Sequence, residues 1–425
     1  MAYTDFIAAI DLGTSHMVGM VGTKNATGAL SIIAYEVENS GSCIRRGCVY
    51  NVKETASKIK RLILKLENKL GGTKIGQVYV GLGGQSLRSI EHTVCKVLGT
   101  EGVVTEEIID SLYQECKDYR PDMLTVLDVV SPSYFLDDKP ESNPVGVPCS
   151  RIEARYKLIV GRPSLKLNIV NSISEQAKIE IAGILVSPLA LGDVVLSDNE
   201  KDLGCALIGF GAGVTTISVY KGGKLASLSV VPFGGNLITK DITNLRVVES
   251  EAERLKITYG SAKADRDNDM TIQVSLADGM GLREIKLAEL NGVIEARMDE
   301  ILENVYARLE ATGLMSVLGA GIVITGGGAA LKNLPAVMSE RLKMEVRYSA
   351  VRKGVVASGD LVVASNPEYA VAVGLLAKGT KNCALYIPPK PEPKIEPVVE
   401  PEPTVEPTPE PEPVKEKPKK EKKKG

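Results

Sequence analysis

The first apolar run of the chain stops at a carboxylate and a turn of small residues. Residues 6–21 read FIAAIDLGTSHMVGMV, so two strand-like stretches flank Asp11, Gly13, Thr14 and Ser15. This pattern predicts a β-hairpin. Because a glycine turn exposes its backbone amides and the hydroxyl groups add donors, the turn is a candidate phosphate-binding loop, with Asp11 at its rim holding Mg²⁺ through water. Alone the motif is weak, since D-x-G-T also occurs in ordinary turns.

Strands and a helix alternate after this hairpin. Residues 30–37 predict a strand, and residues 53–70 predict an amphipathic helix whose apolar side chains recur every three or four positions. Two glycines end this helix, and residues 77–84 return as a buried strand. The series predicts the first lobe of an α/β protein.

A different pattern follows between residues 85 and 160, without a phosphate-type turn. It predicts strands at 89–98, 124–135 and 152–160, and a helix that begins after the cap residue Thr105 and runs to about residue 119. We interpret this segment as an inserted interaction module. The alternative is an extension of the lobe that has only a packing role.

The design of the first hairpin recurs in the second half of the chain. Residues 204–220 read GCALIGFGAGVTTISVY, an apolar strand, a turn that contains Gly211 and Gly213, and a second strand that begins near Thr215. Two related hairpins predict two similar lobes that face each other. A nucleotide phosphate tail would then be held from both sides.

Two further glycine-rich segments fit such a site. Gly234 and Gly235 stand before a predicted helix. A strand at 322–325 is followed by Gly326, Gly327 and Gly328 and then by a predicted helix. The glycines give an adenosine room to lie against the backbone.

A charged pair is the last candidate. In the helix predicted over residues 249–262, Glu253 and Lys256 lie three positions apart on one face. Such a pair can hold a ribose or an adenine edge, although a solvated ion pair is the alternative interpretation.

The other folded segments predict ordinary elements, and the end of the chain predicts none. We expect helices at 165–183, 189–196, 287–309 and 366–377, a strand at 184–187, and strand-like residues at 271–286. Beyond Tyr386 the chain is rich in Pro, Glu and Lys, cannot bury a core, and predicts an extended tail that ends in lysines.

Composition and charge limit the class of protein. With 425 residues, 44% of them apolar, the chain is long enough for several domains. Its net charge of −2 gives no argument for nucleic acid as a partner. Seven scattered cysteines and two histidines predict reduced thiols and no zinc site. Without a signal peptide or an apolar run of ~20 residues, we expect a cytoplasmic protein.

Taken in order, the motifs resemble the actin-like nucleotide-binding superfamily, and most closely its FtsA cell-division family. The resemblance covers roughly residues 5–380 and rests on AAIDLGTS, GAGVTTISVY, PFGGNLITKDI, AERLKITYGSA and VITGGGAALKNL. NPVGVPCSRIEARYKLIVG, LSDNEKDLGCAL and the place of the insertion also look like this family. This resemblance implies a two-lobed actin-like (ribonuclease H-like) α/β ATP-binding fold with an inserted small α+β subdomain and a disordered C-terminal tail.

The resemblance also implies the domains and the site, with ATP and Mg²⁺ as cofactors. The implied domains are 1A (1–84, 162–200 and 356–387), 1C (85–161), 2A (201–233 and 297–355), 2B (234–296) and a tail (388–425). Their implied nucleotide contacts are Asp11, Gly13, Thr14 and Ser15 in the first phosphate loop, Gly211, Gly213 and Thr215 in the second, Gly234 and Gly235 along the cleft, Glu253 and Lys256 at the ribose and base, and Gly326, Gly327 and Gly328 at the adenosine.

By the same resemblance, the protein acts at the division site on the cytoplasmic face of the inner membrane. It would bind the tail of FtsZ through 234–296, self-assemble through 85–161, recruit later division proteins and attach to anionic lipid. Members of the family attach through a C-terminal amphipathic helix, which this sequence lacks. We therefore expect the natural protein to continue into such a helix beyond Gly425.

The second phosphate loop and the residue after an upstream strand depart from the family pattern. The usual second loop reads D-I-G-G-G-T-T-D, but Gly209 and Thr216 replace its two aspartates, and Ser187 stands where hydrolysing relatives often have an acidic residue or Gln. Hydrolysis needs an activated water and a firmly held Mg²⁺. We therefore expect ATP binding with weak or no ATPase activity. The alternatives are a pilus-assembly relative of FtsA and a sugar-kinase-type enzyme of the same superfamily.

Overall fold

The computed structural model describes residues 5–99, 102–275, 281–357, 363, 365–385 and 414. The chain divides into two units, Met1–Tyr386 and Ile387–Gly425. Apart from residue 414, the predicted tail with its terminal lysines lies outside the described residues.

The first lobe is built on a five-stranded sheet of order β11-β6-β1-β2-β3. Its strands are β1 (Ile7–Leu12), β2 (His16–Lys24), β3 (Leu30–Asn39), β6 (Gln77–Leu82) and β11 (Glu180–Val186). The first three are antiparallel to one another, whereas β6 and β11 run parallel to β1. The carboxyl ends of β1, β6 and β11 therefore meet at one edge of the sheet.

The second lobe repeats this arrangement in a sheet of order β14-β13-β12-β17-β18. Its strands are β12 (Cys205–Phe210), β13 (Thr215–Lys221), β14 (Lys224–Val231), β17 (Ile322–Thr325) and β18 (Val346–Tyr348). Three antiparallel strands are again followed by two that run parallel to the first of them. The two hairpins predicted from the sequence thus occupy equivalent places in two equivalent sheets.

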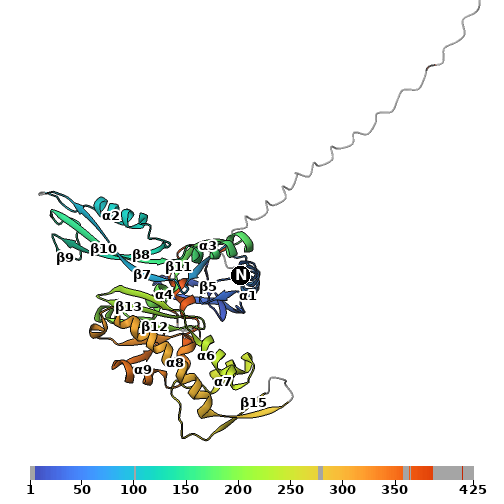
Figure 1. The fold of residues 1–425 in the computed structure, drawn as a ribbon. Helices are drawn as coiled ribbons and strands as arrows, with labels where there is room; N and C mark the ends of the chain where they lie inside the picture. Colours follow the sequence, from blue (N-terminus) through green and yellow to red (C-terminus); the bar gives the residue numbers. More distant parts are fainter. Residues whose placement is uncertain are drawn as a thin grey trace, which may run out of the picture. The chain divides into compact units, whose positions relative to one another are not determined.

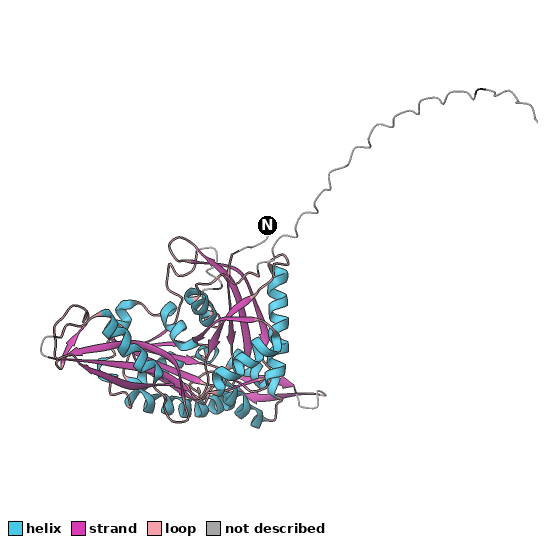
Figure 2. Cartoon of the chain, turned by 90° about the horizontal axis from the view of Figure 1, so that it is seen from above, coloured by secondary structure: helices cyan, strands magenta, loops and turns pink. Residues whose placement is uncertain are grey.

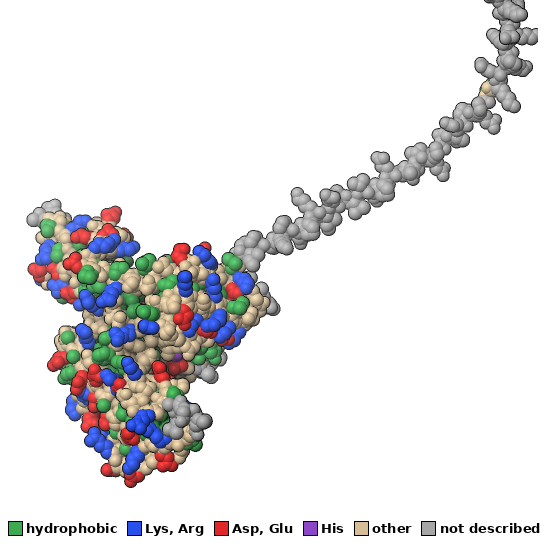
Figure 3. All heavy atoms as spheres, turned by 45° about the vertical axis from the view of Figure 1, so that its right-hand side comes forward, with side chains coloured by type: hydrophobic (Ala, Val, Ile, Leu, Met, Phe, Trp, Pro, Cys, Tyr) green, Lys and Arg blue, Asp and Glu red, His purple; other side chains and the backbone are tan. Residues whose placement is uncertain are grey.

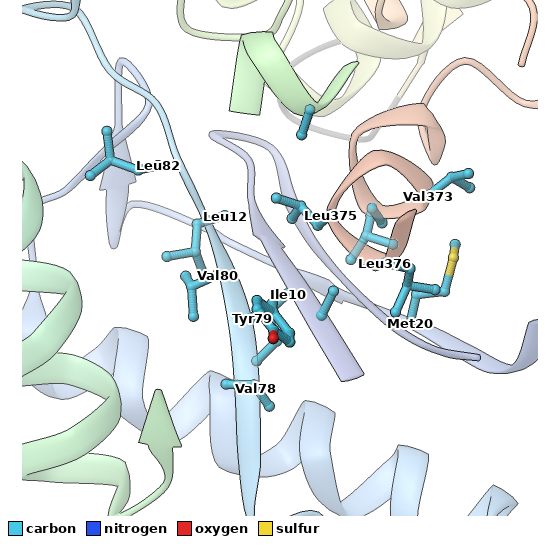
Figure 4. Close-up of a cluster of buried hydrophobic side chains, with 14 of the residues drawn as sticks. Ile10, Leu12, Met20, Val78, Tyr79, Val80, Leu82, Val373, Leu375 and Leu376 are labelled. Carbon is cyan, nitrogen blue, oxygen red and sulfur yellow. The ribbon is translucent and has the colours of Figure 1, made fainter. Parts of the chain in front are cut away.

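Helices cover both faces of the first sheet. They are α1 (Val52–Lys69), α3 (Ser164–Val170) with a π-helical turn (Asn171–Ala177), α4 (Ser187–Val195) and α11 (Ala370–Lys378). Figure 4 shows Ile10, Met20 and Val80 of the sheet gathered with Val373 and Leu376 of α11. Apolar residues at helical spacing produce this packing, since one stripe of each helix must be buried.

Helices and a hairpin also surround the second sheet; Figure 2 shows the helices and strands of the whole chain from above. Its elements are α5 (Asp198–Leu203), α6 (Gly235–Ile242), α7 (Glu249–Tyr259), α8 (Leu287–Glu310), α9 (Leu334–Leu342) and the hairpin β15 (Thr271–Ser275) and β16 (Leu282–Lys286). Strand β12 is buried on both faces: Ala206 and Ile208 face the core with α8, whereas Cys205 and Leu207 join the first-lobe core. The two lobes therefore share apolar packing.

The insertion forms a separate four-stranded antiparallel sheet of order β7-β10-β8-β9, with α2 along one face (Figure 1). The elements are β7 (Arg88–Val97), α2 (Glu106–Asp118), β8 (Thr125–Leu136), β9 (Lys139–Glu141) and β10 (Arg151–Gly161). It has its own apolar cluster, which includes Leu112, Ile152 and Tyr156. As predicted, Thr105 caps α2 by accepting a hydrogen bond from the N–H of Ile108.

Several local predictions were wrong or incomplete. The helix expected over 165–183 ends at Ala177, because Lys178 takes a left-handed conformation (φ 60°) and residues from Glu180 pair with β6 as a strand. The triple glycine forms a 3₁₀ turn (Gly327–Ala330) and the next helix begins only at Leu334. Strands β14 and β18 and helix α5 were not anticipated. Residues 276–280 of the expected strand-like stretch lie outside the described residues.

Candidate functional site

The turns of the two equivalent hairpins touch each other. A Cβ atom built on Gly213 in the β12–β13 turn would lie 2.6 Å from Thr14 Oγ1 and 3.0 Å from Arg46 Cα. Real atoms do not approach so closely, so this contact between the lobes requires glycine. The structure therefore brings the two predicted phosphate loops together.

Neighbouring residues of the first lobe hold the first loop in place. The Ser40 hydroxyl donates to the Gly13 carbonyl (2.7 Å), and the Gly47 N–H donates to Thr14 Oγ1 (2.9 Å). Ser15 Oγ lies 2.9 Å from His16 Nδ1. Because Thr14 Oγ1 accepts the bond from Gly47, the Thr14 hydroxyl keeps its proton as a donor for a ligand.

Asp11 lies at the carboxyl end of β1, beside the ends of β6 and β11. A Cβ on Gly81 would meet Asp11 Oδ1 at 3.2 Å and Ser187 Oγ at 2.5 Å, so both side chains lie over this glycine. Burial raises the pKa of Asp11 to about 6, and only a backbone hydrogen bond from Leu12 opposes this shift. A carboxylate that lacks a cationic partner in a desolvated site is suited to receive one.

A metal ion at Asp11 would draw most of its ligands from elsewhere. In the part of the chain that the structure describes, no three His, Cys, Asp or Glu side chains are grouped to hold an ion. Mg²⁺ normally combines one or two carboxylates with water and phosphate oxygens. The site therefore fits Mg²⁺ that arrives with a phosphate ligand.

The second loop packs against the start of α6. The N–H groups of Gly235 and Asn236 donate to the carbonyls of Gly211 (3.0 Å) and Ala212 (2.8 Å). A Cβ on Gly234 would lie 2.5 Å from the Gly211 oxygen, so this close backbone packing also depends on glycine. Thr215 is an exception among the predicted contacts, because it is fully buried and its hydroxyl donates to the Phe233 carbonyl (2.9 Å).

Glu253 and Lys256 meet over the first turn of α6. Lys256 Nζ lies 2.6 Å from Glu253 Oε2, 2.9 Å from Thr239 Oγ1 and 3.2 Å from the Gly235 carbonyl. The Thr239 hydroxyl also bonds to Glu253. The ion pair considered from the sequence is therefore present, and it lies directly beside one of the glycines assigned to the site.

The triple glycine packs against the end of β12. Gly326 has φ 86°, and a Cβ there would lie 2.5 Å from the Phe210 oxygen; one on Gly328 would lie 3.0 Å from Phe210 Cβ. Gly327 faces Glu368 instead, whose Oε1 would be 3.6 Å from such a Cβ. Sequence reasoning missed Glu368, whose only signal is its place just before α11.

A cavity of about 270 Å³, here called the inter-lobe cavity, opens where the two loops meet. It is lined by Thr14, Gly41, Ser42, Ile44, Arg45, Arg46, Ala212, Gly213, Pro232, Gly234, Asn236 and Leu237. Three of these were predicted contacts, whereas Asp11, Glu253, Lys256 and the triple glycine do not line it. Sequence reasoning missed Arg45 and Arg46, although a basic pair before a glycine was a visible signal.

Two equivalent sheets whose strand ends face a shared site define a two-lobed actin-like α/β fold. A solved structure of the PilM–PilN type IV pilus biogenesis complex matches 88% of this chain and 98% of its own, with a TM-score of 0.62 and 16% identity. The ethanolamine utilization protein EutJ from Carboxydothermus hydrogenoformans matches 89% and 91%, with a TM-score of 0.50 and 14% identity. These likenesses concern the fold alone.

Sequence comparison identifies the family. The family model described as cell division protein FtsA matches residues 206–374. The cell division protein FtsA of Porphyromonas gingivalis is 39% identical over 382 residues, which are 89% of this chain and 79% of that relative. The FtsA proteins of Bacillus subtilis (32%; 91% and 86%) and Escherichia coli K12 (29%; 88% and 90%) are also similar. The chain belongs to the FtsA family of cell division proteins.

Proposed function

We propose that this protein binds ATP with Mg²⁺ between its lobes and links the division protein FtsZ to the cytoplasmic membrane. The contact between the Thr14 and Gly213 turns carries the nucleotide part of this proposal, because it brings a glycine-containing turn of each lobe to one cavity. Asp11 would hold Mg²⁺ through water. Lys256 and Glu253 would hold the ribose and base, and the triple glycine would lie against the adenosine.

Turnover of the nucleotide should be slow. Position 209, where an aspartate would face the phosphates from the second lobe, is glycine, and Asp11 is left as the carboxylate of the paired turns. The absence of an aspartate at position 209 also argues against a kinase activity. ATP affinity and phosphate release measured on one preparation test both statements: absence of binding at millimolar ATP would contradict the first, and release at kinase-like rates of ~1–100 s⁻¹ the second.

The FtsZ tail should dock on residues 234–296. In this region Ile257, Leu282, Met270 and Val248 expose between 74% and 42% of their surface, and Arg246, two residues before Val248, is also exposed. Exposed apolar side chains together with a basic one suit a short, adaptable peptide bound with modest affinity.

Co-sedimentation with polymerised FtsZ tests this surface. Ile257→Ser should weaken co-sedimentation without changing stability, because the side chain is exposed. Leu64→Ser, at a 53% exposed position on α1, is the matched control and should have no effect. Unchanged binding of FtsZ that lacks its tail would refute the assignment.

The inserted module should mediate self-assembly and the recruitment of later division proteins. It has its own apolar cluster, and exposed Met123 (92%) and Val97 (78%) lie on its surface. Its two ends lie close together, because the Arg162 N–H donates to Ser86 Oγ (3.2 Å), so a short linker can replace it. Removal of residues 85–160 should abolish polymers and preserve ATP binding; filaments of such a variant on lipid would refute the proposal.

Membrane attachment should involve anionic lipid. No helix in the described part of the chain is long and apolar enough to cross a bilayer. The lysines near residue 420 should each add ~1 kcal/mol of attraction to an anionic surface at low salt. Flotation with anionic liposomes should therefore be weak and salt-sensitive, and stable flotation at high salt would contradict this mode of attachment.

A further inference from the structure

The inter-lobe cavity is lined by two arginines that are not among the proposed nucleotide contacts. Arg45 and Arg46 lie in a short hairpin of β4 (Ile44–Arg45) and β5 (Cys48–Val49) and line the cavity with Thr14 and Gly213. Among the ion pairs of the described residues, neither arginine takes part in one. None of the described residues that line the cavity is Asp or Glu. Two exposed guanidinium groups at the wall of this cavity, without an ion-pair partner among the described residues, favour an anion.

The position of the cavity indicates which part of a nucleotide it would meet. Thr14 of the first candidate phosphate loop and Gly213 of the second line it. Asp11, at the rim of the first loop, does not, and neither do Lys256 and the triple glycine, the candidates for the ribose and adenosine. The cavity therefore lies at the phosphate end of the site.

Arg46 is fixed where the two lobes and the inserted module meet. Its Cα packs against Gly213 of the second loop, and its carbonyl accepts a hydrogen bond from the N–H of Gln85 (3.1 Å). It has a left-handed φ of 49°, which is uncommon for a residue other than glycine and is often found at functional positions. The next residue, Gly47, bonds to the Thr14 hydroxyl. The backbone of Arg46 is thus held against both loops.

The side chain of Arg46 keeps most of its hydrogen-bonding capacity. Among the described residues, its one side-chain partner is Gln85, through an Nη1–Oε1 contact of 3.3 Å. A guanidinium has five N–H donors in a planar fork that matches phosphate oxygens. Arg45 stacks on Tyr50, with Cζ 3.8 Å from the ring centroid, and supplies a second positive charge nearby.

From this geometry we infer that Arg46, assisted by Arg45, binds the terminal phosphate of a nucleoside triphosphate and makes the site prefer ATP to ADP. The inference rests on the proposed nucleotide binding and adds the group that distinguishes the two ligands. ADP retains the contacts of the glycine loops and loses the bond to Arg46. The preference should therefore depend on this side chain.

The test is Arg46→Gln in the full chain, with ATP and ADP affinities measured in excess Mg²⁺. A hydrogen bond to a charged group corresponds to roughly 10- to 100-fold in affinity, so ATP should weaken by that factor while ADP changes by less than about threefold. Arg46→Lys should keep part of the preference, because it keeps the charge. Arg120→Gln is the charge-matched control, since Arg120 lies outside the cavity and donates to the carbonyls of Lys117 and Tyr119 at the end of α2.

A second control separates phosphate binding from bracing of the loop. Gln85→Ala removes the side chain that bonds to the Arg46 guanidinium and leaves the guanidinium in place, so it should preserve the preference for ATP. If Gln85→Ala loses the preference as Arg46→Gln does, the arginine acts by bracing and the inference is wrong. It is also wrong if Arg46→Gln changes ATP and ADP equally or not at all. In these cases the proposal that the protein binds a nucleotide still stands. If the wild-type protein binds neither ATP nor ADP, both that proposal and the inference about Arg46 are wrong.

Discussion

The two lobes share one topology but differ in their chemistry. Asp11 is the penultimate residue of β1 and pairs with Val18, and Gly209 is the penultimate residue of β12 and pairs with Thr216. One lobe thus presents a carboxylate with a raised pKa to the site, and the other presents backbone. The comparison shows that a repeated fold preserves where a ligand binds, while single residues decide which chemistry is available there.

The lobes also support their turns differently. Side-chain and backbone bonds from Ser40 and Gly47 hold the first turn, whereas backbone bonds from the start of α6 hold the second. The first turn therefore depends on a neighbouring loop that includes Arg46, and the second depends on the packing of a helix. Where the two turns meet, a ligand would contact the arginines beside the first turn and the neutral backbone of the second.

The largest expected effect is that of Asp11→Asn on the free protein. With a pKa of about 6 instead of the ordinary 3.8, ionised Asp11 lowers stability by up to about 3 kcal/mol at pH 7. The folded state binds this proton more tightly than the unfolded state, so stability should fall as the pH rises from about 4 to 6. Asn should remove that fall and raise the free energy of unfolding at pH 7. Denaturant unfolding across this pH range measures both.

A control variant and a ligand measurement complete the test of Asp11→Asn. Asp267→Asn, at an exposed loop position, should leave the pH dependence unchanged. Stabilisation by Mg²⁺ and ATP together should be smaller for Asp11→Asn than for the wild type. Parallel pH profiles for Asp11→Asn and the wild type would show that Asp11 is not desolvated.

Gly213→Ala should weaken the contact between the lobes. The added Cβ would overlap Thr14 and the backbone of Arg46, and overpacking of this kind costs ~1–3 kcal/mol. ATP affinity should therefore fall roughly 10- to 100-fold. Gly83→Ala is the control, because its Cβ would meet nothing within 4 Å. Equal affinities for the two variants would mean that the loops do not close on the nucleotide.

Gly209→Asp would make the lobes chemically more alike. Its Cβ would approach the Thr216 hydroxyl at 2.7 Å, which a side-chain rotation can relieve. A second carboxylate near Mg²⁺ adds about 1 kcal/mol, so Mg²⁺ should tighten ATP binding about fivefold more than in the wild type. Titration of ATP at several Mg²⁺ concentrations measures this difference. No added dependence on Mg²⁺ would place position 209 away from the ion.

The smallest expected effect is that of Glu253→Gln. Lys256 and Glu253 form a partly exposed ion pair, so its loss should change stability by less than ~1 kcal/mol. If Glu253 also contacts the ribose, ATP affinity should fall about threefold. Arg254→Gln, which breaks the neighbouring pair with Glu251, should leave the affinity unchanged. Equal small effects of both variants would leave Glu253 with the role of an ordinary ion pair.

Local patterns in the sequence predicted both hairpins, because apolar strands around a glycine turn have a strong short-range signal. They also predicted α1 and α2, from helical periodicity and the Thr105 cap. The pattern failed where pairing between distant segments decided the outcome. Residues 180–183 continue a helical pattern but form a strand, since β6 offers an unpaired edge.

The amino-acid sequence by itself determined the repeated hairpins, the glycines of the site and the family. Tertiary structure alone decided which of the candidate residues meet. It buried Thr215 under Phe233, joined Lys256 to Thr239, and placed Arg46 between two loops that are far apart in the chain. The physical reason is that conformational preference acts over a few residues, whereas burial and close packing depend on segments brought together only by the complete fold.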